Sequence, residues 1–261
     1  MSSRPELVPL AFDTDEGFGA RARLGLIVLE SDQTIEAEIR SMPSGGPLDG
    51  VAWYHSRIPM EDEVGPDTLR AMEERIPVAA GLLPDRFGFD AIGYACTSAA
   101  TLIGSDGVSA AIGAAHPGVP CTDPIAAAVA AFDAIGARRI SVVTPYSAEV
   151  TAPILDLFER HGIEVVSAGS FLETSDLVVA RIRPDDVASA VRTVVTDDAE
   201  AVFVSCTSLR TFGIVDELET ELGRPVVSSN LALVWHLLRL AGVRDDVSGL
   251  GSLLGSAQLS E

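Results

Sequence analysis

The sequence contains no lysine. All 18 of its lysine-plus-arginine residues are arginine, against 38 aspartate and glutamate residues, and the formal net charge is −20. Without lysine, neither a lysine Schiff base with pyridoxal phosphate nor a lysine-dependent phosphate-binding loop can form. A negative charge of this size also repels nucleic acids and anionic membrane surfaces, so neither is an expected partner.

Long apolar runs, cysteine frameworks and cofactor fingerprints are also missing. No segment reaches the roughly twenty consecutive apolar residues of a membrane-spanning helix, and residues 1–10 lack the pattern of a signal peptide. The cysteines at 96, 121 and 206 are odd in number and share no metal-ligand spacing. We therefore expect no disulfide framework, no metal site and a cytoplasmic location. No G-x-G-x-x-G sequence indicates a nicotinamide or flavin site, and no cofactor is expected.

Short apolar runs alternate with helical patterns along most of the chain. Strands are expected at residues 24–29, 50–58, 91–95, 140–144, 162–168 and 201–205. Helices are expected at residues 34–42, 67–80, 124–135, 153–161, 184–195 and 232–241. This alternation is typical of βαβ units with a mainly parallel sheet. We expect two α/β lobes, the first formed by residues 1–121 plus 226–261 and the second by residues 122–225.

An internal repeat points to the site. Five strand-like residues precede Cys96-Thr97-Ser98 and again precede Cys206-Thr207-Ser208. Because open α/β sheets bind ligands at the carboxyl ends of their strands, each lobe should place one cysteine in a common cleft. A thiol between a strand and a helix meets the N–H groups of the first helical turn, which would lower its pKa. Either cysteine alone would be read as a small buried apolar residue, but the matched pair favours function.

Two facing thiols suggest two kinds of catalysis, and a third function, binding without catalysis, stays open. One thiolate could remove a proton from a substrate carbon while the other thiol delivers one to the opposite face. With an alkene, one thiolate could instead add to the double bond, allow rotation and be eliminated. A protein that only binds a metabolite would need neither cysteine.

Other residues are candidates for contact with a ligand. Asp32 and Tyr146 follow corresponding strands, and the hydroxyls after each cysteine are candidates for binding a carboxylate. Cys121 has no matching context.

The two Cys-Thr-Ser motifs, the turn Thr144-Pro145-Tyr146 and the segment from Ser229-Asn230 to Trp235 resemble one branch of the aspartate/glutamate racemase superfamily. That branch holds the maleate isomerases and arylmalonate decarboxylase. The resemblance covers about residues 23–241 and implies pseudo-twofold α/β lobes with parallel sheets, an active site in the cleft between them, no metal, no organic cofactor and a homo-oligomer. It also implies that Cys96 and Cys206 are the catalytic thiols and that Thr97, Ser98 and Tyr146 hold a substrate carboxylate.

Two departures from that family bear on the substrate. The decarboxylase has glycine at the position of Cys96, so decarboxylation by a single cysteine is not expected. The maleate isomerases have asparagine at the positions that match Asp32 and Asp176. An anion there would repel a dicarboxylate by about 1 kcal/mol or more at about 4 Å. A small carboxylate that also carries an amino or amidinium group is therefore the expected substrate.

The run Leu26 to Asp32, followed by Thr34-Ile35-Glu36, is similar to ectoine-utilisation protein A. That resemblance implies a racemase or isomerase acting through two cysteines on an amino acid from ectoine breakdown. The alternatives are a maleate-type cis–trans isomerase that adds Cys96 to its substrate and a non-catalytic metabolite-binding protein.

Overall fold

Two parallel four-stranded sheets form the framework of the computed structural model, which describes residues 7–43, 46–61 and 64–255. The first sheet has the order β2 (Val51–Ile58), β1 (Ala22–Leu29), β3 (Ala91–Ala95) and β4 (Cys121–Thr122). The second has the order β6 (Glu164–Ser170), β5 (Arg139–Thr144), β7 (Ala201–Val204) and β8 (Val226–Ser228). The two sheets repeat the same strand order, and the predicted α/β class with two parallel sheets is confirmed.

Helices connect the strands of both sheets. In the first part of the chain they are α1 (Ile35–Ser41), α2 (Pro66–Arg70), the 3₁₀ helix η1 (Glu73–Arg75), α3 (Ile76–Ala80), the 3₁₀ helix η2 (Asp85–Phe87), α4 (Thr97–Ile103), α5 (Ser105–Gly113) and α6 (Pro124–Ile135). In the second part they are α7 (Ala148–Arg160), α8 (Asp176–Val179), α9 (Pro184–Val194), α10 (Val215–Leu222), α11 (Ser229–Leu240) and α12 (Gly251–Gly255). In the part of the chain that is described, no helix is long and apolar enough to cross a membrane.

The strands next to the site are buried on both faces, which explains why their sequences read as continuous apolar runs. β3 and β7 are wholly buried, and β1 is buried over its last six residues. Behind β7, the rings of Phe132, Phe158 and Phe203 pack edge to face with centroids 5.1 to 6.1 Å apart. Such contacts add to the apolar area that these rings bury and fix the strand that carries the second cysteine.

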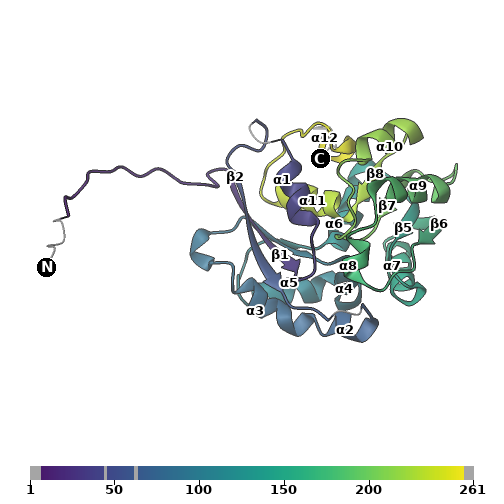
Figure 1. Cartoon of the computed structure of the whole chain (residues 1–261), viewed down its shortest axis with the longest axis horizontal. Coiled ribbons are helices and arrows are strands. Elements are labelled where there is room, and N and C mark those ends of the chain that lie inside the picture. The colour runs from purple at the N-terminus through teal and green to yellow at the C-terminus, as the bar shows by residue number, and fades with distance from the viewer. Residues whose placement is uncertain (1–6, 44–45, 62–63, 256–261) are drawn as a thin grey trace, which may run out of the picture.

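Helix α11 joins the two lobes. It contacts β3 and β4 of the first sheet, β8 of the second, and α6, and in Figure 1 it lies with α6 in the middle of the molecule. Gly93 in β3 permits this approach, because a Cβ there would lie only 3.0 Å from a methyl group of Leu237. The described residues that precede β1, from Leu7 onward, extend away from the body in the same view (Figure 1).

Several predicted elements need correction. The predicted helix over residues 67–80 is wrong, since that stretch is divided into α2, η1 and α3. Pro77 has no N–H to continue a helix that starts upstream, and it occupies the first turn of α3 instead. The short strands β4 and β8 and the helix α10 were not predicted. The division of the chain into residues 1–121 plus 226–261 and residues 122–225 stays a proposal. Strand β4, at the first boundary, pairs in the first sheet, whereas β8, which begins at the second boundary, pairs in the second sheet.

Candidate active site

The two cysteines end equivalent central strands, but their backbones differ. Cys96 directly follows β3 and is the N-cap residue of α4, as the sequence predicts. Cys206 lies two residues beyond β7, with a φ of 102° that a residue with a side chain seldom adopts. The prediction of a helix N-terminus directly after Cys206 is wrong, because turns follow it and α10 starts only at Val215.

Residues from both lobes line one small cavity of about 20 Å³. Its polar lining consists of Cys96, Thr97, Ser98, Tyr146, Asp176, Cys206 and Thr207, and its apolar lining of Leu29, Met60, Val64 and Leu69. Every polar side chain of this lining is less than a tenth exposed. Seven of the nine predicted site residues therefore meet at one place, while Asp32 and Ser208 lie outside the lining.

Both thiols are neutral in the resting site. Burial raises the pKa of Cys96 to about 11, although the Ala99 N–H and the Ser98 hydroxyl, whose oxygen lies 3.7 Å from the sulfur, act in the opposite direction. Burial, followed by the charge of Asp176, raises the pKa of Cys206 well above its usual range. The lowered thiol pKa that the sequence suggested is wrong, because desolvation outweighs the helical N–H groups.

Hydrogen-bond donors stand ready for a thiolate at each cysteine. The Ser208 N–H lies 3.4 Å from the Cys206 sulfur. The Tyr146 hydroxyl also lowers the pKa of Cys206, and the Tyr94 hydroxyl, which has no hydrogen-bond partner among the described residues, has a smaller effect in the same direction on Cys96. Burial raises the pKa of both phenols well above the usual range, so both stay protonated donors. Each thiolate, once formed, would have a phenol and a backbone N–H to stabilise it.

Asp176 gives the cavity one anionic wall. It is the first residue of α8, and its carboxylate accepts hydrogen bonds from Ser31 at 2.5 Å and from Ser208 at 2.8 Å. Asp176 also lines an open hollow next to the cavity, together with Glu30 and Glu61. Glu61 is paired with Arg75 at 2.6 Å. A ligand that enters by this hollow meets carboxylates first.

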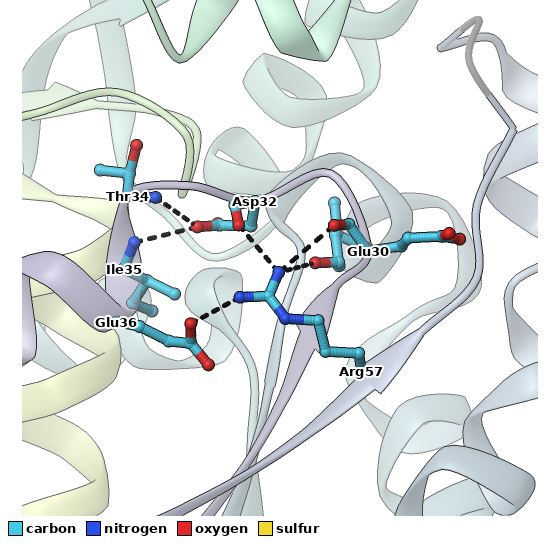
Figure 2. Close-up of polar contacts among 7 residues, drawn as sticks. Glu30, Asp32, Thr34, Ile35, Glu36 and Arg57 are labelled. Atoms are coloured by element: carbon cyan, nitrogen blue, oxygen red, sulfur yellow. Dashed lines mark hydrogen bonds and ion pairs between the residues drawn. The ribbon is translucent and has the colours of Figure 1, made fainter.

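Asp32 shapes the loop after β1. Figure 2 shows its carboxylate accepting from the N–H groups of Thr34 at 2.7 Å and Ile35 at 3.0 Å, which caps the start of α1. Burial raises the pKa of Asp32 to about 6, and its second oxygen has no hydrogen-bond partner among the described residues. In the same view Arg57 donates to the backbone carbonyls of Glu30 and Asp32 (Figure 2), and also to that of Leu29.

Two residues of the segment that carries the family resemblance, to which sequence reasoning gave no role in the site, connect the two cysteine loops. The Ser229 hydroxyl oxygen accepts from the Thr97 hydroxyl at 2.8 Å and from the Cys206 N–H at 3.0 Å. Asn230 donates to the Thr207 carbonyl at 2.9 Å and to Glu38 at 2.7 Å. Both residues directly follow β8, the short strand that the sequence analysis did not find. The rule that ligands gather at the carboxyl ends of strands would have indicated them once β8 was recognised.

Fold and site together define a two-lobed α/β protein with a buried thiol pair between its sheets. A family model described as arylmalonate decarboxylase matches residues 60–254. The maleate isomerase of Alcaligenes faecalis is 26% identical over 249 residues, which cover 90% of this chain and 97% of that protein. The crystal structure of the maleate isomerase Iso from Pseudomonas putida S16 has a TM-score of 0.81 at 26% identity, covering 90% of this chain and 99% of that one.

A third relative shares the fold. It is a mutant Nocardia farcinica maleate cis–trans isomerase with a covalently bound succinylcysteine intermediate, with a TM-score of 0.82 at 24% identity, covering 89% of this chain and 98% of that one. The chain belongs to the arylmalonate decarboxylase family and is a distant homologue of the maleate isomerases.

Proposed function

We propose that this protein is a cofactor-independent isomerase that uses Cys96 and Cys206 on the two faces of one carbon of a small carboxylate. The observation that carries the proposal is the pair of buried thiols lining one small cavity, each with its own donors for a thiolate. Near-complete exclusion of water is suited to a carbanionic intermediate, which bulk water would protonate without facial selectivity.

In the proposed reaction, substrate binding is coupled to the loss of one thiol proton to solvent, so that one cysteine is a thiolate and the other remains a thiol. The thiolate takes the proton from the carbon α to the carboxylate and becomes a thiol, leaving the electron pair on the carbon and delocalised into the carboxylate. The opposite thiol then delivers its proton to the other face and becomes a thiolate. Thr97, Ser98 and Tyr146 are proposed to donate hydrogen bonds to the carboxylate as its charge increases.

The charge of the cavity bears on the substrate class. Asp176 lines the cavity, and no arginine is among the residues that line it in the described part of the chain. An ammonium group beside Asp176 would be attracted, whereas a second carboxylate there would be repelled. We therefore propose an amino-bearing carboxylate, of the kind that a role in ectoine breakdown would supply. In this proposal Thr207 contacts the substrate directly, and Asp32 and Ser208 act from behind the lining.

A second candidate is cis–trans isomerisation of maleate. The homology to maleate isomerases and the succinylcysteine intermediate in one relative favour it. In that reaction the Cys96 thiolate would form a C–S bond to one alkene carbon and the adjacent carbon would accept a proton from Cys206. Rotation about the resulting single bond, return of that proton and loss of the thiolate would then restore the alkene.

One experiment separates these functions. The protein is incubated in D₂O with maleate, aspartate, glutamate, diaminobutyrate, its acetylated forms and ectoine, and the carbon-bound hydrogens are followed by NMR. Deuterium uptake at an α-carbon that disappears in Cys206→Ala is the expected result. Conversion of maleate without α-exchange on any amino acid would establish the second candidate. Binding without turnover, unchanged in both cysteine variants, would make the protein a metabolite-binding protein.

A further inference from the structure

The loop that carries Cys206 is fixed by groups that lie outside it. Thr34 donates its hydroxyl to the Ser208 carbonyl at 2.8 Å, and the Asn230 amide donates to the Thr207 carbonyl at 2.9 Å. The loop contains the left-handed φ of Cys206, a conformation that costs free energy unless the surroundings maintain it. What maintains it therefore decides where the Cys206 sulfur points.

Glu38 makes the largest share of these contacts. Its Oε1 accepts from the N–H groups of Thr211 at 2.5 Å and Phe212 at 2.8 Å, and its Oε2 accepts from the Asn230 amide at 2.7 Å. Glu38 lies in α1, one helical turn after Thr34, so both residues face the loop from the same side of one helix. A first-lobe helix thus supports the catalytic loop that follows a strand of the second sheet.

Burial of a carboxylate costs free energy, so Glu38 is an unfavourable link between two segments unless its charge is needed. Glu38 is 8% exposed, and each of its partners in these contacts is neutral. Every partner is also a donor, which suits a carboxylate and not an amide, since an amide would present an N–H₂ group to another donor. The charge therefore has a specific use that glutamine, the closest neutral side chain in shape, would not serve.

We infer that Glu38, together with Thr34, is a positioning residue that holds Cys206 in the orientation required for proton transfer. This inference rests on the proposed function for its catalytic readout, but not for its structural one. Glu38 touches neither the cavity nor a sulfur atom. Its effect should therefore be confined to Cys206 and leave Cys96 unaffected.

The test compares the two thiols separately in the full-length protein. At pH 8, above the pKa of about 7 to which burial raises Glu38, alkylation of Cys206 by iodoacetamide is measured in a Cys96→Ser background, and alkylation of Cys96 in a Cys206→Ser background, with mass spectrometry of the modified peptide. Glu38→Gln should loosen the loop that holds the buried Cys206 and so speed its alkylation by about tenfold or more, which is the effect of losing a hydrogen bond to a charged acceptor. The alkylation rate of Cys96 should change by less than about twofold. Equal changes at both thiols, or an unchanged Cys206, would overturn the inference.

Glu36→Gln is the matched control. Glu36 is in the same helix, but it pairs with Arg57 at 2.5 Å, and Arg57 keeps its bonds to three backbone carbonyls without it. This variant should leave both alkylation rates unchanged. If Glu38→Gln does not fold, Thr34→Val removes a contact to the same loop, and the same selective increase at Cys206 is then required.

The catalytic readout follows once a substrate is known. In the protein with both cysteines, Glu38→Gln should lower kcat by tenfold or more and leave KM within about twofold, because Glu38 does not line the cavity. A change in KM alone would contradict a role in positioning Cys206. Because alkylation requires no substrate, failure of every compound in the D₂O experiment would leave the alkylation result valid.

Discussion

Replacing Asp176 by asparagine should lower the pKa of both thiols. The charge of Asp176 contributes to the raised pKa of Cys206 and, more weakly, of Cys96. The asparagine keeps one oxygen to accept a hydrogen bond, and the hydroxyls of Ser31 and Ser208 can each rotate to donate or accept. The substitution should therefore remove the charge with little change in the shape of the cavity.

The structure gives the size of this effect. Ser208 links the two groups, with its hydroxyl oxygen 2.8 Å from Asp176 and its N–H nitrogen 3.4 Å from the Cys206 sulfur. If the carboxylate and the sulfur are taken to lie about 6 Å apart, on either side of Ser208, an effective dielectric constant of about 20 gives a contribution of about 3 kcal/mol per unit charge. This corresponds to about two pKa units. Rearrangement of nearby dipoles reduces the effect, so we expect a fall of one to two units at about this distance.

Alkylation by iodoacetamide between pH 6 and 10 measures the change directly. The thiolate is the reactive form, and below its pKa the thiolate fraction increases tenfold for each unit by which the pKa falls. Asp176→Asn should therefore speed alkylation of Cys206 at pH 8 by about 10- to 100-fold. Asp186→Asn makes the same change at an exposed carboxylate that pairs with Arg183 and should have no effect. Identical pH profiles for Asp176→Asn and the parent protein would refute the electrostatic reasoning.

Three further predictions follow from the described contacts. Cys96→Ala and Cys206→Ala should each abolish turnover while the urea midpoint falls only slightly, and substantial activity in either would contradict the two-thiol mechanism. Phe203→Ala should lower the free energy of unfolding by about 3–5 kcal/mol in urea titrations, because it removes a buried ring that packs against both Phe132 and Phe158. Burial raises the pKa of Asp32 to about 6 and that of Glu38 to about 7. The folded protein then binds more protons than the unfolded chain from about pH 4 to 7, so stability should fall as pH rises through this range, and Glu38→Gln should flatten the dependence.

The features predicted from sequence were those set by short local patterns. Residues 91–95 and 201–204 are almost wholly apolar because both faces of a central parallel strand are covered, and this pattern can be recognised without knowing which elements cover the strand. The repeated Cys-Thr-Ser triplets then predicted that the two lobes meet at Cys96 and Cys206. This approach missed short elements. Strand β8 has three residues, too few for a periodic signal, although it places Ser229 at the site.

The charge state of the site depends on tertiary burial and could not be predicted in this way. Cys96 has the helical N–H neighbours that the sequence indicates, yet desolvation determines its pKa. Glu38 illustrates the same limit. A glutamate on a short amphipathic helix is usually solvated, and only the approach of a loop 173 residues further along the chain turns it into a buried acceptor.

Under the proposed function, recognition of the substrate and activation of the thiols are one event. Asp176 disfavours thiolate at both cysteines as long as its charge is uncompensated. A substrate ammonium group beside Asp176 would neutralise that charge and lower both thiol pKa values, whereas a second carboxylate would raise them further. Asp176 would thus favour binding of an amino-bearing acid and would leave the thiols protonated and unreactive when a diacid is bound. In the resting protein it would keep two nucleophiles protonated and protected from oxidation, which thiolates undergo more readily than thiols.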